Sequence, residues 1–194
     1  SPWNYPLALA AGDTIPALIA GNAVVQKPDN QTALTALWAL QLAREAGLPA
    51  DSWQLVLGSG ATIGDTLIEN ADYLMFTGST ATGRGMAERA AARLIGSSME
   101  LGGKNAMLVL DDADLDRTVE GAVRACFSSS GQLCISIERM YVQDAIFDAF
   151  VMRFVDAVRA MRLGGGYDFG YDMGSLTTAA QLDAVTAHVQ DAVA

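Results

Sequence analysis

The stretch FTGSTATGRG, Phe76 to Gly85, indicates the fold class of this 194-residue chain. It closes an apolar run that begins at Tyr73 and lacks polar alternation, which is typical of a strand covered on both faces. Gly-Ser-Thr follows, and an alanine-rich helical segment begins at Thr80. Unpaired N–H groups at such a helix start bind anions, and Ser79 adds a donor, so a phosphate group would fit there. Taken alone, these residues are better explained by a plain tight turn with a small N-cap residue.

On both sides of this stretch, strand and helix patterns alternate. Strands are expected at Ala23–Lys27, Trp53–Gly58, Tyr73–Gly78, Ser98–Leu101, Asn105–Leu110 and Ile137–Val142. Helices are expected at Pro6–Ala20, Thr32–Ala46, Ala61–Asn70, Thr80–Leu94, Asp114–Phe127, Ala145–Met161 and from about Thr178 onward. This alternation predicts an α/β fold with a Rossmann-like, mostly parallel sheet and flanking helices. The run DDAD at Asp111–Asp114 predicts a boundary between domains 1–110 and 111–194.

The composition argues against nucleic acid or a membrane as the main partner and favours a reducing compartment. The formal charge is −10, so nucleic acid and anionic membrane are not expected as partners. The apolar segment Leu7–Val25 contains Asp13 and Pro16 and is interpreted as a buried helix and a strand, not a membrane span. No signal peptide is visible, and two cysteines do not make a disulfide scaffold, so a cytoplasmic location is expected. Both ends look cut, which suggests a fragment.

Two charged residues stand at the ends of expected strands. Lys27 ends an apolar strand before Pro28, where α/β folds bind ligands, but a solvated lysine before a proline turn is the favoured explanation in isolation. Glu100 ends another strand before two glycines, and apolar neighbours would raise the pKa of its carboxyl, as suits a general base. A glutamate in solvent is an equal alternative.

Cys134, in SSSGQLCIS (Ser128–Ser136), is either a nucleophile or an inert thiol. His188 is the only histidine and lies in the last expected helix, so neither a Cys-His pair nor a metal site is expected. Cys126 is expected on the buried face of its helix, which argues against a disulfide. A nucleophilic thiol would need activation and oxyanion donors, and the side-chain NH2 of Asn4 is a candidate donor.

Five separated motifs together resemble those of the aldehyde dehydrogenase superfamily. They are PWNYP (Pro2–Pro6), AGNAVVQKP (Ala20–Pro28), FTGSTATG (Phe76–Gly83), ELGGKN (Glu100–Asn105) and GQLC (Gly131–Cys134). They occur in the family's order, and a weaker similarity continues to MGSL at Met173–Leu176. The resemblance implies a cofactor domain followed by the first part of an α/β catalytic domain.

The resemblance also implies roles for individual residues. Cys134 would attack the aldehyde, Asn4 and the Cys134 N–H would hold the oxyanion, and Glu100 would activate water to hydrolyse the thioester. The cofactor, NADP or NAD, would be bound by residues spread over the first half of the chain, namely Trp3, Lys27, Asn30, Gly58, Gly78, Ser79 and Leu101. No metal is implied.

Two residues depart from the family pattern. Ser129 stands where many members have Asn, which weakens the expected support of the cysteine loop. Asn30 stands where many NAD-preferring members have a glutamate, and an uncharged side chain would not repel a 2′-phosphate. We therefore expect NADP to be accepted. Members of the family are also longer at both ends, so the chain alone is expected to have little activity and to expose apolar surface.

Within the family, CISIERMYV (Cys134–Val142) and LMFTGSTATG (Leu74–Gly83) resemble bacterial succinate-semialdehyde dehydrogenases most. Succinate semialdehyde is therefore the expected substrate, and another aliphatic aldehyde is the alternative. The resemblance implies a homo-oligomer for the longer parent. An inactive or binding-only fragment remains possible, as does a CoA-acylating or phosphorylating relative, although Glu100 favours hydrolysis.

Overall fold

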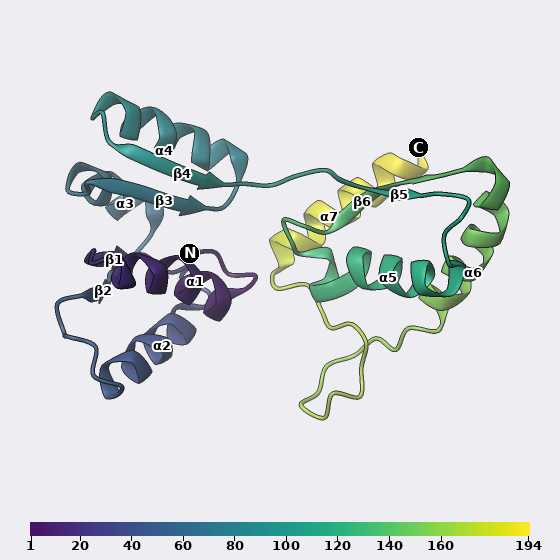
Figure 1. Ribbon diagram of the computed structural model, residues 1–194, viewed down its shortest axis with the longest axis horizontal. Coiled ribbons are helices and arrows are strands. Elements are labelled where there is room, and N and C mark those ends of the chain that lie inside the picture. The colour runs from purple at the N-terminus through teal and green to yellow at the C-terminus, as the bar shows by residue number, and fades with distance from the viewer. The chain divides into compact units, whose positions relative to one another are not determined.

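The computed structural model describes all residues, 1–194, and contains every expected helix and strand (Figure 1). The helices are α1 (Pro6–Ile19), α2 (Ala33–Glu45), α3 (Gly60–Glu69), α4 (Thr80–Ala92), α5 (Leu115–Phe127), α6 (Phe147–Arg159) and α7 (Ala179–Val193). The strands are β1 (Val24–Gln26), β2 (Trp53–Leu55), β3 (Tyr73–Thr77), β4 (Gly96–Glu100), β5 (Asn105–Val109) and β6 (Ile137–Val142). The expected boundaries hold to within a few residues.

All strand pairing is parallel, which confirms the predicted α/β class. The strands form three pairs, β1–β2, β3–β4 and β5–β6, each a separate two-stranded sheet. Parallel strands cannot be joined by a hairpin, so a helix lies between the two strands of each pair in the chain.

The chain divides into two compact units, residues 1–102 and residues 103–194. Strand β5 pairs with β6 and so belongs to the second unit, whereas the expected boundary lay after it. The assignment of a cofactor domain to 1–110 and a catalytic domain to 111–194 stays a prediction, because packing does not identify function.

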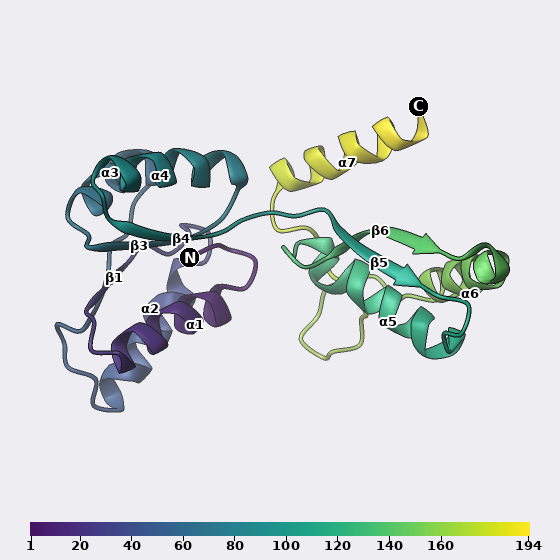
Figure 2. The same ribbon diagram turned by 45° about the horizontal axis from the view of Figure 1, so that its top comes forward.

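In the first unit a buried side chain joins α1, β1 and β2. Gln26, 8% exposed, donates from Nε2 to the carbonyl of Ala10 at 3.0 Å and accepts the indole N–H of Trp53 at 3.2 Å. Both ends of its amide are therefore satisfied inside the core. Helices α3 and α4 lie on one face of the β3–β4 pair (Figures 1 and 2). None of the helices has the length and apolar composition of a bilayer span.

The second unit has its own core between α5, α6 and the β5–β6 pair. Its fully buried members are Val109, Val119, Ala122 and Phe150. The ring of Phe150 stacks on Phe154, one turn later on α6, at a centroid distance of 5.7 Å. This packing fixes α5, and α5 ends directly before the cysteine loop.

We expect Gln26→Leu to destabilise the first unit by about 2–4 kcal/mol, because the buried Trp53 N–H would lose its acceptor. Gln54→Leu is the matched control, since Gln54 is exposed on the neighbouring strand and should cost under about 0.5 kcal/mol. Urea unfolding followed by tryptophan fluorescence measures both, because all 3 tryptophans lie in residues 1–102. Equal destabilisation by the two substitutions would contradict the assigned role of Gln26.

Candidate functional site

The first residues of the chain run alongside the end of β1. The nitrogen of Ser1 donates to the carbonyl of Lys27 at 2.9 Å, and the N–H of Asp29 donates back to the carbonyl of Ser1 at 3.0 Å. This ladder places Trp3 and Asn4 just beyond the segment that carries Lys27. The pairing itself involves Ser1, and Trp3 and Asn4 follow Ser1 along the chain.

The side-chain amide of Asn4 has a defined orientation. Its Oδ1 accepts the N–H of Tyr5 at 3.1 Å, so the NH2 end of the same amide points the opposite way. Asn4 is half-buried. This orientation suits a side chain that presents donors, as an oxyanion requires.

Lys27 and Asn30 flank a turn at the end of β1. Lys27 is half-buried, and its Nζ donates to the carbonyl of Pro28 at 2.9 Å. Asp29 closes the turn by accepting the N–H of Gln31 on Oδ1 at 2.9 Å, and Asn30 between them is exposed. The lysine charge and the Asn30 amide are therefore at the carboxyl end of a parallel strand.

Two strand-to-helix turns of the first unit are built alike. Gly58–Ser59 follows β2 and starts α3, and Gly78–Ser79 follows β3 and starts α4. Each serine caps its helix, accepting a threonine N–H on Oγ at 3.2 Å in α3 and 3.3 Å in α4. The first N–H groups of α4, those of Thr80 and Ala81, have no carbonyl partner within the helix. Unpaired N–H groups at a helix N-terminus, as at this end of α4, are a common binding site for phosphate groups.

Side chains lie close to two glycines, Gly78 before α4 and Gly83 inside it. A Cβ on Gly78 would lie 2.6 Å from the ring of Phe76, and one on Gly83 would lie 2.4 Å from the side chain of Leu101. The N–H of Gly78 also donates to the carbonyl of Glu100 at 3.0 Å. The motifs FTGSTATG and ELGG therefore pack directly on each other, and Leu101 is held beside the start of α4.

The carboxyl of Glu100 ends β4 and is exposed, so of the two equal alternatives from the sequence the glutamate in solvent is the one that the structure shows. A second carboxyl, Asp13 of α1, lies in its electrostatic surroundings. Burial raises the pKa of Asp13, and the charge of Glu100 raises it as well.

Cys134 occupies a β-turn directly before β6. The N–H of Ser136 donates to the carbonyl of Leu133 at 3.1 Å, so Cys134 and Ile135 are the two central residues of the turn. The thiol is exposed. Ser136 is only 4% exposed, and its hydroxyl donates to the carbonyl of Cys126 at 3.2 Å, which ties the turn to the last turn of α5. An exposed thiol on a fixed turn is more suited to a nucleophile than to packing.

The loop before this turn is strained. Ser129 and Ser130 have φ values of 53° and 59°, in the left-handed region that non-glycine residues seldom adopt. The strain is held by contacts with a distant segment: the Ser130 hydroxyl donates to the carbonyl of Gly174 at 3.0 Å, and the N–H of Thr177 donates to Oε1 of Gln132 at 3.0 Å. The segment Gly174–Thr177 therefore supports the loop that precedes Cys134.

Cys126 is a half-buried free thiol on the same helix face as Val119 and Ala122. Burial raises its pKa, which makes it a poorer nucleophile at neutral pH. Both cysteines are free, and no group of three His, Cys, Asp or Glu side chains is arranged to hold a metal ion.

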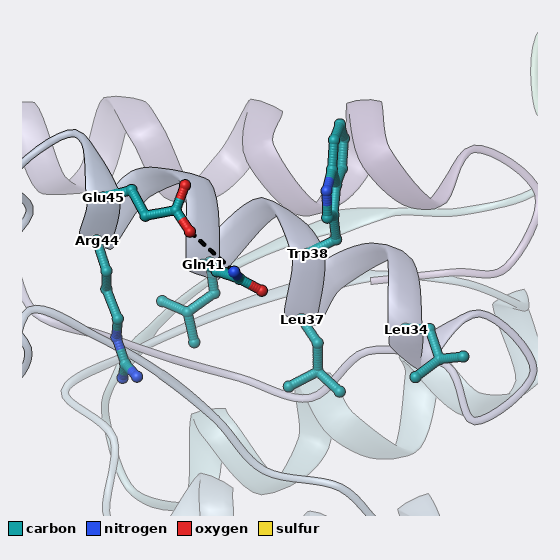
Figure 3. A pocket seen from close by; sticks show the side chains of 7 residues that line it. Leu34, Leu37, Trp38, Gln41, Arg44 and Glu45 are labelled. Carbon is teal, nitrogen blue, oxygen red and sulfur yellow. Dashed lines mark hydrogen bonds between the residues drawn. The ribbon is translucent and has the colours of Figure 1, made fainter.

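A shallow groove on α2 contains none of the predicted site residues. It is lined by Leu34, Leu37, Trp38, Leu40, Gln41, Arg44 and Glu45. Leu34 and Leu37 project to one side of the helix and Trp38 to the other (Figure 3). Leu34 is 81% exposed, so the expectation of exposed apolar surface is confirmed here.

Comparison with known proteins identifies the family. The aldehyde dehydrogenase family model matches residues 1–194. The chain belongs to the aldehyde dehydrogenase family. A Mycobacterium ulcerans protein, provisionally named an NADP(+)-dependent succinate-semialdehyde dehydrogenase, is 57% identical over 100% of this chain and 38% of its own length. The chain thus spans well under half of that relative.

Solved aldehyde dehydrogenase structures share the fold. An Escherichia coli structure described as an NADP-dependent enzyme matches with a TM-score of 0.96 and 40% identity, over 99% of this chain and 40% of its own. A succinate-semialdehyde dehydrogenase from Burkholderia pseudomallei matches with a TM-score of 0.95 and 37% identity, over 99% and 40% of the two chains. These matches confirm the predicted fold class and family.

Sequence reasoning missed two residues that touch the cysteine turn, Asn105 and Ser136. Asn105 was noticed only as the last letter of ELGGKN, yet its side chain reaches the carbonyls of Cys134 and Ser136. The one signal in the sequence for this role is the position of Asn105, a polar residue at the start of an apolar strand and shortly after two glycines.

We expect Ser129→Asn to stabilise the second unit by about 0.5 kcal/mol, because asparagine tolerates the left-handed conformation better than serine. Ser129→Val should cost about 1–2 kcal/mol for the opposite reason. Ser128→Asn is the control, since Ser128 has a φ of −54° and gains nothing from asparagine. Thermal unfolding followed by circular dichroism measures all three, and an equal gain at Ser128 and Ser129 would contradict the strain assigned to Ser129.

Proposed function

We propose that this chain supplies the nucleophile, the base and part of the cofactor-binding surface of an NADP- or NAD-dependent aldehyde dehydrogenase that oxidises succinate semialdehyde. The observation that carries the proposal is Cys134 itself: an exposed thiol on a turn whose backbone is fixed by hydrogen bonds. The name of the 57% identical Mycobacterium ulcerans relative supports the substrate and NADP. The relative's greater length makes the activity of the whole protein a proposal.

The proposed chemistry is covalent. The Cys134 thiolate forms a bond to the aldehyde carbon, and the carbonyl electron pair moves to oxygen, where the Asn4 NH2 group and the Cys134 N–H stabilise it. When held by the cofactor residues of the first unit, a nicotinamide cofactor would supply the hydride acceptor: the former aldehyde carbon would lose a hydride, and the oxyanion electron pair would re-form the carbonyl as that of a thioester. Glu100 then takes a proton from water as the water oxygen attacks the thioester, and the Cys134 sulfur leaves as thiolate. The products are succinate and the regenerated thiol.

The proposed cofactor surface lies in the first unit. Ser79 and the N–H groups at the start of α4 suit the pyrophosphate, with Gly58 and Gly78 at the two strand ends. Lys27 suits a ribose, and Trp3 and the Leu101 backbone would flank the cofactor. These assignments rest on strand-end placement and on the family motifs.

We further propose that the complete protein is a cytoplasmic homo-oligomer, as the family resemblance implies. Hydrolysis is favoured over acyl transfer to CoA because Glu100 is present to activate water. A turnover that required CoA would contradict this choice.

We expect Cys134→Ala to abolish NADPH formation from succinate semialdehyde, with a loss of at least about 10³-fold in kcat, because no other group can form the thioester. The measurement uses a chimaera in which residues 1–194 replace the matched 38% of the Mycobacterium ulcerans relative. Cys126→Ala is the matched control and should keep at least about half of the native kcat, because its thiol is half-buried and its pKa is raised. Retained turnover in Cys134→Ala would remove the proposed mechanism.

We expect Asn30→Glu in the same chimaera to raise the KM for NADP by at least about 10-fold, because a carboxylate would repel the 2′-phosphate. The KM for NAD should change less, since NAD lacks that phosphate. Asn30→Gln is the control that keeps the charge. An equal effect of Asn30→Glu on both cofactors would place Asn30 away from the ribose.

A further inference from the structure

Two carbonyls of the cysteine turn, those of Cys134 and Ser136, are bound by one side chain. Nδ2 of Asn105 donates to the carbonyl of Cys134 at 2.6 Å and to the carbonyl of Ser136 at 3.0 Å. An amide NH2 group has two hydrogens, and here both point at the turn. Asn105 is half-buried, so these bonds are partly shielded from water.

The start of the β5–β6 pair is shaped to aim Asn105 at the turn. Asn105 pairs with Ile137, but Ala106 pairs with Arg139, so Glu138 is an extra residue that bulges out of β6. Such a bulge turns a side chain out of the regular alternation, and bulges are frequent beside active sites. Lys104 forms an ion pair with Glu138 and holds the bulge from outside.

Gly103 leaves room for the Asn105 amide. A Cβ at this position would lie 3.1 Å from Oδ1 and 3.4 Å from Nδ2 of Asn105, a tight contact that the amide could relieve only by a small shift. The absence of a side chain at Gly103, the second glycine of ELGGKN, is thus explained by the neighbouring Asn105 amide and does not require a contact with the cofactor.

The opposite side of the turn is also fixed. The Ser136 hydroxyl donates to carbonyls in the last turn of α5, those of Ala125 at 3.4 Å and Cys126 at 3.2 Å. The turn is therefore attached to β5 through Asn105 and to α5 through Ser136. Its thiol is exposed while its backbone is held, which is the combination that a preorganised nucleophile needs.

We propose that Asn105 is a positioning residue for Cys134, and that it acts by holding the carbonyls of Cys134 and Ser136 so that the Cys134 N–H and thiol keep the geometry of acyl transfer. The proposal rests on the proposed function in naming Cys134 as the nucleophile. Asn105 touches neither substrate nor cofactor in this role. Its effect is on the formation of the tetrahedral adduct, where a misplacement of the reacting groups is costly.

The test compares two reactions of Cys134 in the 194-residue chain, each followed by peptide mass spectrometry. Acylation by p-nitrophenyl acetate passes through an oxyanion and needs a placed N–H donor, whereas exchange with a small aromatic disulfide does not. The variants are Asn105→Ala and Asn105→Asp, the second of which keeps the shape but lacks both donors. Gln143→Ala is the control: its side chain accepts the N–H of Asp111 at the opposite end of the same strand pair.

We expect both Asn105 variants to lower the ratio of acylation rate to disulfide-exchange rate by at least tenfold, and Gln143→Ala to leave it within twofold. Hydrogen exchange at Leu133–Ser136 should be faster by at least tenfold in the Asn105 variants only, since the turn loses its anchor on β5. The proposal would be overturned if the ratio stayed unchanged in the Asn105 variants, whether or not the two rates changed together. It would also be overturned if the native chain had a ratio no higher than that of the chain unfolded in guanidinium. Neither aldehyde nor cofactor is used, so failure of the dehydrogenase mechanism would appear separately, as turnover retained in Cys134→Ala.

Discussion

Parallel pairing governs this structure, because two parallel strands can be joined only by a connection that crosses from one end of the pair to the other. Every strand of the chain is in such a pair, and each pair has a helix between its strands. Parallel pairing puts the carboxyl ends of β1 and β2 at the same edge of their pair, and those of β3 and β4 at the same edge of theirs. Lys27, Gly58 and Gly78 follow these strands, so one constraint of connectivity places the proposed cofactor residues.

This constraint also explains how far the sequence could predict the fold. An apolar run without alternation predicted β3. The helices expected to end at Ala20 and Ala46 are followed by Gly21 and Gly47, whose φ values of 86° and 101° are typical of residues that end a helix. The separation into three two-stranded sheets could not be predicted, because hydrophobic patterns do not state which strands are neighbours. The pairing of β5 within the second unit was missed for the same reason.

The site was predictable only in part. The rule that α/β folds bind ligands at the carboxyl ends of their strands predicted Lys27 and Ser79 as site residues. Cys134 precedes β6 and lies at the amino end of its strand pair, so this rule does not predict it. The family motif GQLC found it instead. Asn105 was missed because its bonds join residues 29 and 31 positions apart and depend on a bulge that no local pattern encodes. Ser129 was noticed as a departure from the family, and its left-handed backbone gives that departure a physical meaning.

The central claim is that Cys134 carries the oxidised substrate as a thioester. Its most direct test is mass spectrometry of the Glu100→Gln chimaera after succinate semialdehyde and NADP are added and the reaction is quenched in acid, since loss of the base should leave the thioester unhydrolysed. The account predicts one succinyl group on the peptide that contains Cys134, formed only when aldehyde and NADP are both present. A chimaera that reduces NADP without a succinyl group on Cys134, or that carries the group on Cys126, would contradict it.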